Sequence, residues 1–384
     1  MILHNVNSFS GGKALCIHIK NGKIAVVAAE SDLLPEAATH LYFENAMAFP
    51  GLINSHDHLD FNLFSQTGNS IYNNYTAWGT DIHKTNKEQI NAVMTIPQQL
   101  RIQWGLYKNL LCGITTVVEH GNKIHIEEEI ITVFQDSYNL HSVGFERNWK
   151  YKLNRPFLKK MPVVIHTGEG TDTAAAEEIN SLLKWNLFKR KLIAVHGVAM
   201  NARQASGFAS LVWCPASNYF LLNKTAAVGE LKKATSIIFG TDTTLTASWN
   251  IWDHLRLARK QNSLTDKELF NTVTKTAATA WQMQGKGAIA KGAIADIVVA
   301  KTNDGTADSF YAINPDDILL VLHKGDIRLF DESIKDQLIN SGADRNKFTK
   351  ITVGTATKYI WGNISGVIEQ IKTYYPQARF PVSI

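Results

Sequence analysis

The central part of the chain repeats one pattern, in which a short apolar run ends in polar or charged residues and a longer helical stretch follows. The runs cover residues 46–56, 113–120, 141–146, 163–166, 192–196, 210–214 and 237–242. Alternation of buried strands with helices is typical of βα units, whose strands pair in a parallel sheet. The pattern therefore predicts an α/β fold built on a parallel sheet.

The number of these runs is close to that of a TIM barrel, which has eight strands, each followed by a helix. We predict a distorted (β/α)8 barrel over residues 50–284. The segment 147–161 is too short for a complete strand-helix-strand passage. Either a further strand lies near residues 149–153, or one unit of the barrel is abbreviated; the residues leave both alternatives open.

Two helices of this region are predicted to begin with capping boxes, in which the first and fourth residues bond each other's backbone. Thr85 with Glu88 forms one candidate box, and Thr265 with Glu268 forms the other.

The two ends of the chain differ from the centre, because they contain short β-rich runs punctuated by glycine. Two such runs flank Asn21-Gly22, and others surround Gly287 and Gly292. Runs of this kind, joined by tight turns, are typical of β-strands. We predict that residues 1–49 and 285–384 together form a small β-sandwich-like domain, which the chain leaves and rejoins.

The composition favours a cytoplasmic protein without a nucleic-acid or membrane partner. The net charge of +5 is small for 384 residues, whereas nucleic-acid-binding proteins usually show a broad basic face. The three cysteines are far apart and form no CxxC pair, which fits a reducing compartment. The first residues lack a signal-peptide pattern, and the apolar runs are too short to cross a bilayer.

Two histidines, His56 and His58, close the first of the apolar runs. Residues two apart on a strand share a face, so both imidazoles can point at one ion. Imidazole suits borderline ions such as zinc. The pair alone is a weak motif, because two histidines in a turn are often only surface groups. Its place at the end of a parallel strand, where TIM barrels carry their active sites, favours a metal site.

Three further apolar runs also end in a residue that can bind a metal ion, namely His166, His196 and Asp242. A single histidine behind an apolar run is more often a buried structural residue than a ligand. Four strand ends that carry histidine or aspartate make that interpretation improbable. They indicate one site at the mouth of the barrel.

The chain resembles the amidohydrolase superfamily, in particular its chlorohydrolase and nucleobase-deaminase branch. The segments that carry the resemblance are Phe49-Pro-Gly-Leu-Ile-Asn-Ser-His-Asp-His58, Gly113-Ile-Thr-Thr-Val-Val-Glu-His120, His166-Thr-Gly-Glu169, Val195-His196-Gly197, Cys214-Pro-Ala-Ser-Asn218 and Gly240-Thr-Asp242. The closing segment Gly287-x-Ile-x-x-Gly292-x-x-Ala295-Asp296-Ile-Val also resembles the return strand of the family into its small β-domain. Together the segments cover most of the chain from about residue 46 to residue 300, and the set in order is highly specific.

This resemblance implies a role for each matching residue. The metal ligands would be His56, His58, His166 and Asp242. They would hold one divalent transition ion, with zinc expected and iron or manganese as alternatives. Such an ion lowers the pKa of bound water from about 15.7 toward about 7 and so supplies hydroxide at neutral pH. Glu169 would shuttle protons, His196 would lie near the water or the substrate, and Asp242 could accept a proton from the water.

Relatives that hold two ions usually bridge them through a modified lysine on the fourth strand. Lys150 and Lys152 lie in the relevant stretch, but their aromatic, basic setting is typical of a surface segment. One ion is therefore expected.

Several residues near the strand ends are candidates for substrate contact. They are Trp78, His120, Arg147, Trp149 and Asn218. Trp78 belongs to the aromatic-rich segment 60–80, whose rings could line the pocket or simply pack on the barrel. For His120 and Asn218, which end strands, a structural role is an alternative.

We predict hydrolytic deamination of an aminated nitrogen heterocycle, a small-molecule substrate. The segment His166-Thr-Gly-Glu169 resembles the deaminase signature, nearby aromatic rings could stack on a flat ring, and no arginine pair stands out that would fix a dicarboxylate. Hydrolysis of a cyclic amide or imidazolone is the second interpretation. A catalytically silent barrel that acts as a binding protein is the third. A homodimer is plausible.

Overall fold

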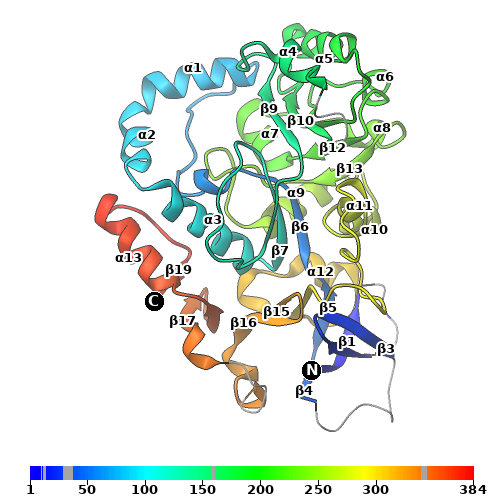
Figure 1. The fold of residues 1–384 in the computed structure, drawn as a ribbon, viewed down its shortest axis with the longest axis vertical. Coiled ribbons are helices and arrows are strands. Elements are labelled where there is room, and N and C mark those ends of the chain that lie inside the picture. Colours follow the sequence, from blue (N-terminus) through cyan, green and yellow to red (C-terminus); the bar gives the residue numbers. More distant parts are fainter. Residues whose placement is uncertain (10, 12–13, 29–37, 157–160, 339–343) are drawn as a thin grey trace.

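Parallel strands that follow one another along the chain form the centre of the molecule (Figure 1). The structure is a computed structural model that describes residues 1–9, 11, 14–28, 38–156, 161–338 and 344–384. The strands are β6 (Leu52–Asp57), β7 (Ile114–Glu119), β8 (Thr132–Phe134), β9 (Tyr138–Ser142), β10 (Val163–Thr167), β11 (Leu192–His196), β12 (Ser210–Trp213) and β13 (Ser236–Phe239).

These strands pair in two sheets, a 3-stranded sheet β6-β7-β8 and a 5-stranded sheet β13-β12-β11-β10-β9. The sheets meet where the turn after β13 lies against β6, because the N–H groups of Thr241 and Asp242 donate to the carbonyl of His56 at 3.2 and 3.0 Å. Between β8 and β9 the described residues show no strand pairing. The α/β fold is confirmed, whereas these pairings do not confirm a closed barrel.

Each predicted run overlaps a strand of the structure, although the run 141–146 shares only residues 141–142 with β9. Of the two alternatives for the segment 147–161, the strand at residues 149–153 is wrong. Residues 149–153 form the helix α4 (Trp149–Leu153), and the additional strand is β8, which precedes β9. Lys150 and Lys152 both lie on α4 and not on a strand, and Lys152 pairs with Glu146. Residues 157–160 of the same segment lie outside the described residues.

The run 46–56 is divided at Gly51 into two strands that belong to different sheets. β5 (Ala46–Pro50) pairs with β14 and β1, and β6 pairs with β7. A Cβ atom at Gly51 would lie 2.3 Å from Oγ1 of Thr115 on β7, so only glycine allows this close approach. The histidines that follow are thereby placed at the far end of β6.

Helices connect and cover the parallel strands. They are α1 (Tyr75–Thr85), α2 (Lys87–Met94), α3 (Gln98–Leu111), α4, α5 (Thr173–Trp185), α6 (Ala202–Ala205), α7 (Pro215–Leu222), α8 (Val228–Leu231), α9 (Ile251–Lys260), α10 (Asp266–Thr272) and α11 (Lys275–Ala280). In Figure 1, α1 and α2 form an arm that stands away from the strands. No helix of the described ranges is long and apolar enough to span a bilayer.

One of the two predicted capping boxes is confirmed. At α10, Thr265 and Glu268 bond each other's backbone as predicted. The box at Thr85 and Glu88 is wrong, because α1 continues through Thr85 and α2 begins after Asn86, without a side-chain cap.

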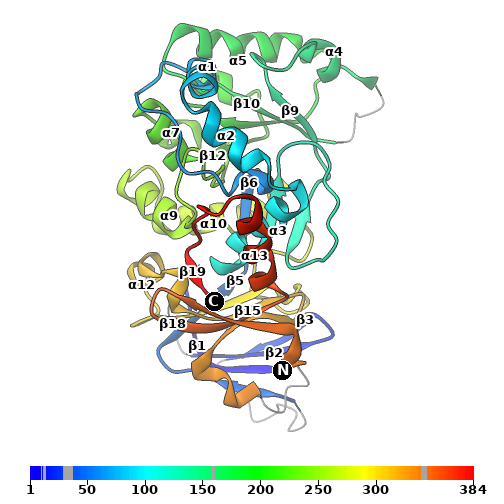
Figure 2. The same cartoon turned by 90° about the vertical axis from the view of Figure 1, so that its left-hand side faces the viewer.

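Both ends of the chain contribute to one 11-stranded sheet, which lies beside the parallel strands (Figure 2). Its strands are β1 (Ile2–Ser8), β2 (Leu15–Lys20), β3 (Lys23–Ala28), β4 (His40–Tyr42), β5, β14 (Ile297–Lys301), β15 (Ile318–His323), β16 (Asp326–Asp331), β17 (Phe348–Val353), β18 (Ala356–Trp361) and β19 (Val382–Ser383). The helices α12 (Ala307–Ala312) and α13 (Ile364–Tyr374) accompany it, and α13 packs against α3.

The joining of the two chain ends follows from their hairpins and their apolar faces. Asn21 and Gly22 have φ values of 52° and 71°, as the tight turn between β2 and β3 requires. Leu3 from the first end and Leu320 from the second belong to one buried cluster. A sandwich of two layers is not shown, and the domain limits at residues 49 and 285 stay a prediction.

Candidate metal and catalytic site

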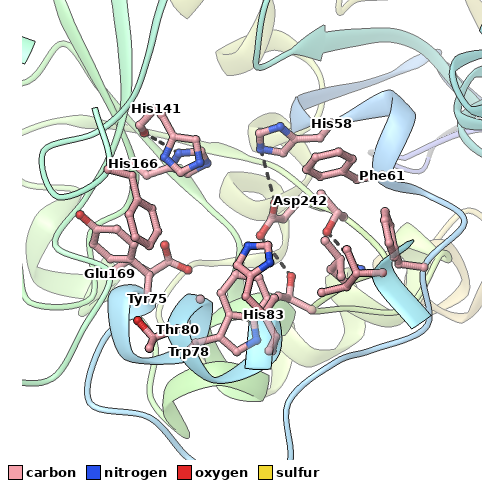
Figure 3. Close-up of a pocket in the computed structure, with 18 of the residues that line it drawn as sticks. His58, Phe61, Tyr75, Trp78, Thr80, His83, His141, His166, Glu169 and Asp242 are labelled. Carbon is pink, nitrogen blue, oxygen red and sulfur yellow. Dashed lines mark hydrogen bonds and ion pairs between the residues drawn. The ribbon is translucent and has the colours of Figure 1, made fainter. Parts of the chain in front are cut away.

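Three histidine side chains, His56, His58 and His166, meet at the carboxyl ends of β6 and β10. Figure 3 shows two of them, His58 and His166, at the cavity. One nitrogen from each of His56, His58 and His166 lies within 4.8 Å of the others. The Nε2 atoms of His56 and His166 are 3.1 Å apart. Asp242, from the turn after β13, places Oδ1 3.5 Å from Nε2 of His56 and 3.9 Å from Nε2 of His58.

The donors fit a divalent metal ion. In a tetrahedral site with metal–nitrogen bonds of about 2.0–2.1 Å, two nitrogens lie roughly 3.3 Å apart, close to the separation of the His56 and His166 nitrogens. Nδ1 of His166 donates to the carbonyl of His141 at 2.7 Å, which leaves the lone pair of Nε2 free for an ion. Burial and the neighbouring imidazoles lower the pKa of His58 to about 3 and that of His166 well below its usual value. Both rings are therefore neutral, as metal ligands must be.

The carboxylate of Asp242 is oriented by two hydroxyl groups. Its Oδ2 accepts hydrogen bonds from Ser217 at 2.7 Å and from Thr246 at 3.2 Å, so Oδ1 is left to face the histidines. Burial by itself would raise the pKa of Asp242, but the hydrogen bond from His56 and the electrostatic effect of the neighbouring imidazoles hold it below its usual value. Asp242 is therefore an anion that a cation can bind.

A buried polar network fixes β6 from behind. Asp57, between the two histidines, accepts hydrogen bonds from Lys108 at 2.9 Å and from Asn109 at 2.8 Å, both on α3. Asn54 donates to Oγ1 of Thr241 at 2.8 Å and accepts from the N–H of Thr241 at 3.0 Å. The network thus joins β6 to the turn that carries the aspartate ligand.

Glu169 and His196 face each other beside the histidine cluster. The turn at Gly168, with a φ of 64°, carries Glu169 past the end of β10, and His196 ends β11. Oε1 of Glu169 lies 3.6 Å from Nε2 of His196. Burial and the nearby carboxylates of Asp242 and Glu178 raise the pKa of Glu169 well above its usual value, whereas burial lowers the pKa of His196 to about 4. Glu169 can therefore hold a proton near neutral pH, next to an uncharged imidazole.

A chain of hydrogen bonds determines which nitrogen of His196 carries its proton. Nε1 of Trp213 donates to Thr225 Oγ1 at 2.7 Å, and Thr225 donates to Asn218 Oδ1 at 3.2 Å. The amide of Asn218 therefore presents Nδ2 to Nδ1 of His196, 2.9 Å away. Since Nδ1 accepts, the ring proton is on Nε2, which faces Glu169.

These groups border a cavity of about 800 Å³. His58, His166, Glu169, His196 and Asp242 line it, and His56 lies buried behind it. Aromatic side chains of the segment 60–80 also line it, namely Phe61, Phe64, Tyr75 and Trp78. Trp78 therefore lies where substrate contact is predicted, with its Nε1 bonded to the carbonyl of Thr67 at 2.9 Å.

The other predicted substrate contacts lie elsewhere. The described residues that line the cavity do not include Asn218, which is buried beneath His196, or His120, Arg147 and Trp149. Arg147 is exposed in a turn, and Trp149 packs into the hydrophobic core. His120 borders a second cavity of about 410 Å³. Its ring lies 4.4 Å from that of His166, and neither of its buried nitrogens has a hydrogen-bond partner.

Two parts of the site were not predicted from the sequence. The first is Lys108, which is buried in α3 and meets Asp57 across 51 residues of chain. The second is the arm of α1 and α2, which lines the cavity with Ile82, Ile90 and Met94. The only signal for the arm was its neighbouring aromatic segment, since apolar residues at such spacings occur in most surface helices.

Comparisons with known proteins agree with this site. Residues 158–328 match the amidohydrolase family. The 5-methylthioadenosine/S-adenosylhomocysteine deaminase of Caldicellulosiruptor saccharolyticus is 23% identical, over 82% of this chain and 88% of that protein.

Solved structures share the fold over most of the chain. An adenosine deaminase from Xanthomonas campestris with bound zinc has a TM-score of 0.71 at 16% identity, over 98% of both chains. The aminofutalosine deaminase of Helicobacter pylori has a TM-score of 0.67 at 14% identity, over 85% of this chain and 99% of that one. The atrazine chlorohydrolase of Arthrobacter aurescens with zinc has a TM-score of 0.64 at 15% identity, over 85% of this chain and 94% of that one.

The matched segment contains three of the strand-end residues discussed above, His166, His196 and Asp242, and the common fold extends over the rest of the site. Both findings agree with the resemblance in the sequence. The chain is therefore similar to the amidohydrolase family over residues 158–328, and it shares its fold with deaminases and a chlorohydrolase, which supports a hydrolase that acts on carbon–nitrogen bonds.

Proposed function

We propose that this enzyme deaminates an aminated nitrogen heterocycle by hydrolysis. The observation that carries the proposal is the pairing of Glu169 with His196, 3.6 Å apart, beside the three-histidine cluster in one cavity. A carboxyl group that holds a proton near neutral pH, next to a metal site, suits the protonation of a ring nitrogen. The name of the deaminase relative supports this choice.

The proposed metal ligands are His56, His58, His166 and Asp242. One divalent ion, with zinc expected, would polarise water and make hydroxide available at neutral pH. Water adds to the amino-bearing carbon, and Asp242 accepts a proton. Glu169 donates its proton to the adjacent ring nitrogen. The proton held by Asp242 then passes to the amino group, the added hydroxyl group returns a proton to Glu169 as it becomes a carbonyl, and the carbon–nitrogen bond breaks to release ammonia. The Nε2–H of His196 donates a hydrogen bond to the oxygen that adds.

We also propose that the eight parallel strands form a distorted (β/α)8 barrel over residues 50–284. In this proposal residues 1–49 and 285–384 form a second, β-rich domain. A cytoplasmic location and a homodimer remain predictions.

The direct test is an ammonia assay on the zinc-loaded protein with a panel of aminated purines, pyrimidines, pterins and triazines. At least one compound is expected to react with kcat/KM above ~10⁴ M⁻¹s⁻¹, the low end for efficient enzymes. Cyclic amides and imidazolones are assayed in parallel for ring opening. Ring opening without ammonia from any aminated compound would decide for the alternative reaction, and inactivity of a metal-loaded protein on both classes would favour a binding protein.

A further inference from the structure

The cavity is much larger than the heterocycle that the proposed reaction requires. It measures about 800 Å³. A bicyclic ring of about ten heavy atoms has a volume of about 120 Å³, which equals the volume of roughly four water molecules at ~30 Å³ each. The reacting groups that line the cavity come from the ends of parallel strands, and Figure 3 labels His58, His166, Glu169 and Asp242 among them. A ring placed against them leaves most of the cavity for another part of the substrate.

The wall away from the reacting groups is mainly apolar and comes largely from the arm of α1 and α2. Trp78 and Ile82 line the cavity from α1, and Ile90 and Met94 line it from α2. Ile82 is 4% exposed, so it is fixed in the fold, whereas Met94 keeps 47% of its surface exposed although it lines the cavity. The exposed surface of Met94 adjoins the cavity, so a ligand that fills the cavity can cover it.

Carboxylates are confined to the reactive side. The lining within the described parts of the chain includes no lysine and no arginine, and its only carboxylates are Glu169 and Asp242. The arm adds two polar side chains from α1, Thr80 and His83, of which only the imidazole of His83 can carry a charge. Away from His83, a phosphate or carboxylate placed against Trp78, Ile82, Ile90 and Met94 would lose its hydration without a cation to pair with. An ammonium group would meet the same difficulty, because both acids are engaged in the reaction. The arm therefore suits an uncharged group.

We propose that the substrate is an aminated heterocycle that carries a bulky, uncharged, largely apolar substituent, and that Trp78, Ile82, Ile90 and Met94 bind this substituent. The inference rests on the proposed deamination for the ring and the reaction, and it adds the class of compound. Free bases and nucleotides are poor substrates in this account, because the first leave the arm uncovered and the second bring charge to it.

The test compares matched trios of compounds built on adenine, guanine and a diaminotriazine. Each trio contains the bare ring, its benzyl derivative and its carboxybenzyl derivative, with the substituent on a ring nitrogen or exocyclic nitrogen remote from the amino group that leaves. Burial of roughly 100 Å² of apolar surface predicts that the benzyl compound gains about 50- to 100-fold in kcat/KM over the bare ring. The carboxybenzyl compound is expected to lose most of this gain.

A charge placed on the arm tests the same inference from the side of the protein. Met94→Lys should raise the kcat/KM of the carboxybenzyl compound relative to the benzyl compound by at least about 5-fold, the size of a partly exposed ion pair. The matched control is Asn91→Lys, which adds the same charge to an exposed position of α2 that does not line the cavity. The control should leave this ratio within about 2-fold.

The outcomes separate the inference from the proposed function. Ammonia release at equal rates from bare and benzylated rings would overturn the inference and leave deamination standing. Absence of ammonia from every trio would overturn the proposed deamination. The inference about the substituent would then be tested by measuring how tightly the compounds bind. In that case, calorimetric titration of the metal-loaded Glu169→Gln protein must show that benzyl compounds bind more tightly than carboxybenzyl compounds. Equal or reversed affinities would overturn the inference about the substituent.

Discussion

The two sides of the cavity are built differently. The strand-end side consists of polar groups that other buried polar groups hold in place, such as Asp57 with Lys108 and His196 with Asn218. The side formed by α1 and α2 presents mainly apolar groups, and the hydrophobic contacts that such groups make with a ligand do not depend on a fixed direction. A substitution on the first side should therefore damage the reaction or the fold, whereas one on the second should change which compounds react.

The largest effect is expected for the metal ligands. His56→Ala removes the most deeply buried imidazole of the cluster, and we expect the ion content to fall from about one per chain to below ~0.1, with loss of activity. Elemental analysis of the purified protein checks the ion. Met94→Gln, on the arm, should keep it. An equal loss of ion in both variants would remove the distinction between the two sides.

The next effect concerns the network behind β6. Lys108→Met leaves the carboxylate of Asp57 buried without its cation, which should lower the free energy of unfolding by about 3–5 kcal/mol. Urea unfolding measures it, with Lys84→Met on exposed α1 as the matched control. A decrease below about 1 kcal/mol would mean that the network does not hold the strand.

Glu169→Gln should separate binding from reaction. The amide keeps the shape of the side chain but cannot shuttle a proton, so kcat is expected to fall by ~10²-fold or more while the ion and the fold remain. The measurement is turnover together with ion content on the best compound of the panel. Wild-type turnover in a metal-replete variant would move the proton transfer to another group, with His196 the first candidate.

A smaller effect, of about 10-fold on kcat, is expected at Asn218. In Asn218→Asp the carboxylate accepts from Nδ1 of His196, so the ring proton moves away from Nε2. The ¹⁵N shifts of the His196 ring report this exchange independently of activity. Thr225→Val removes the hydroxyl group that donates to Asn218, so the proton of the His196 ring should be held less strongly on Nε2. Thr225→Ser keeps the hydroxyl group and should restore the proton to Nε2. Unchanged ring shifts in Asn218→Asp would show that other contacts set the proton.

The sequence predicted the strand-end side better than the arm, for a physical reason. His56, His58, His166 and Asp242 end buried runs, and the ends of parallel strands meet at one edge, so local pattern implies their proximity. The short strand β8 escaped this reasoning, because three half-buried residues carry little pattern. The basic and aromatic residues 149–153 suggested a hidden strand but form a helix, which five residues rarely specify by themselves.

Contacts between distant segments were not predictable in the same way. Lys108 lies among apolar residues of α3, and its neighbours in the sequence do not indicate that its side chain pairs with Asp57. Asn218 was predicted near the site, but its partner, Nδ1 of His196, depends on the packing of α7 beneath β11. Ile90 and Met94 follow ordinary helical spacing, and only the placement of the arm makes them part of the cavity.

The central claim is that one ion, held by three histidines and an aspartate, supports deamination. The most direct measurement is a titration of the metal-free protein with zinc, in which ammonia release from the best compound is followed against zinc per chain. We expect the rate to rise in proportion to zinc and to level at about one ion per chain. A rate that does not depend on zinc, iron or manganese, or that levels only at two ions, would contradict the claim.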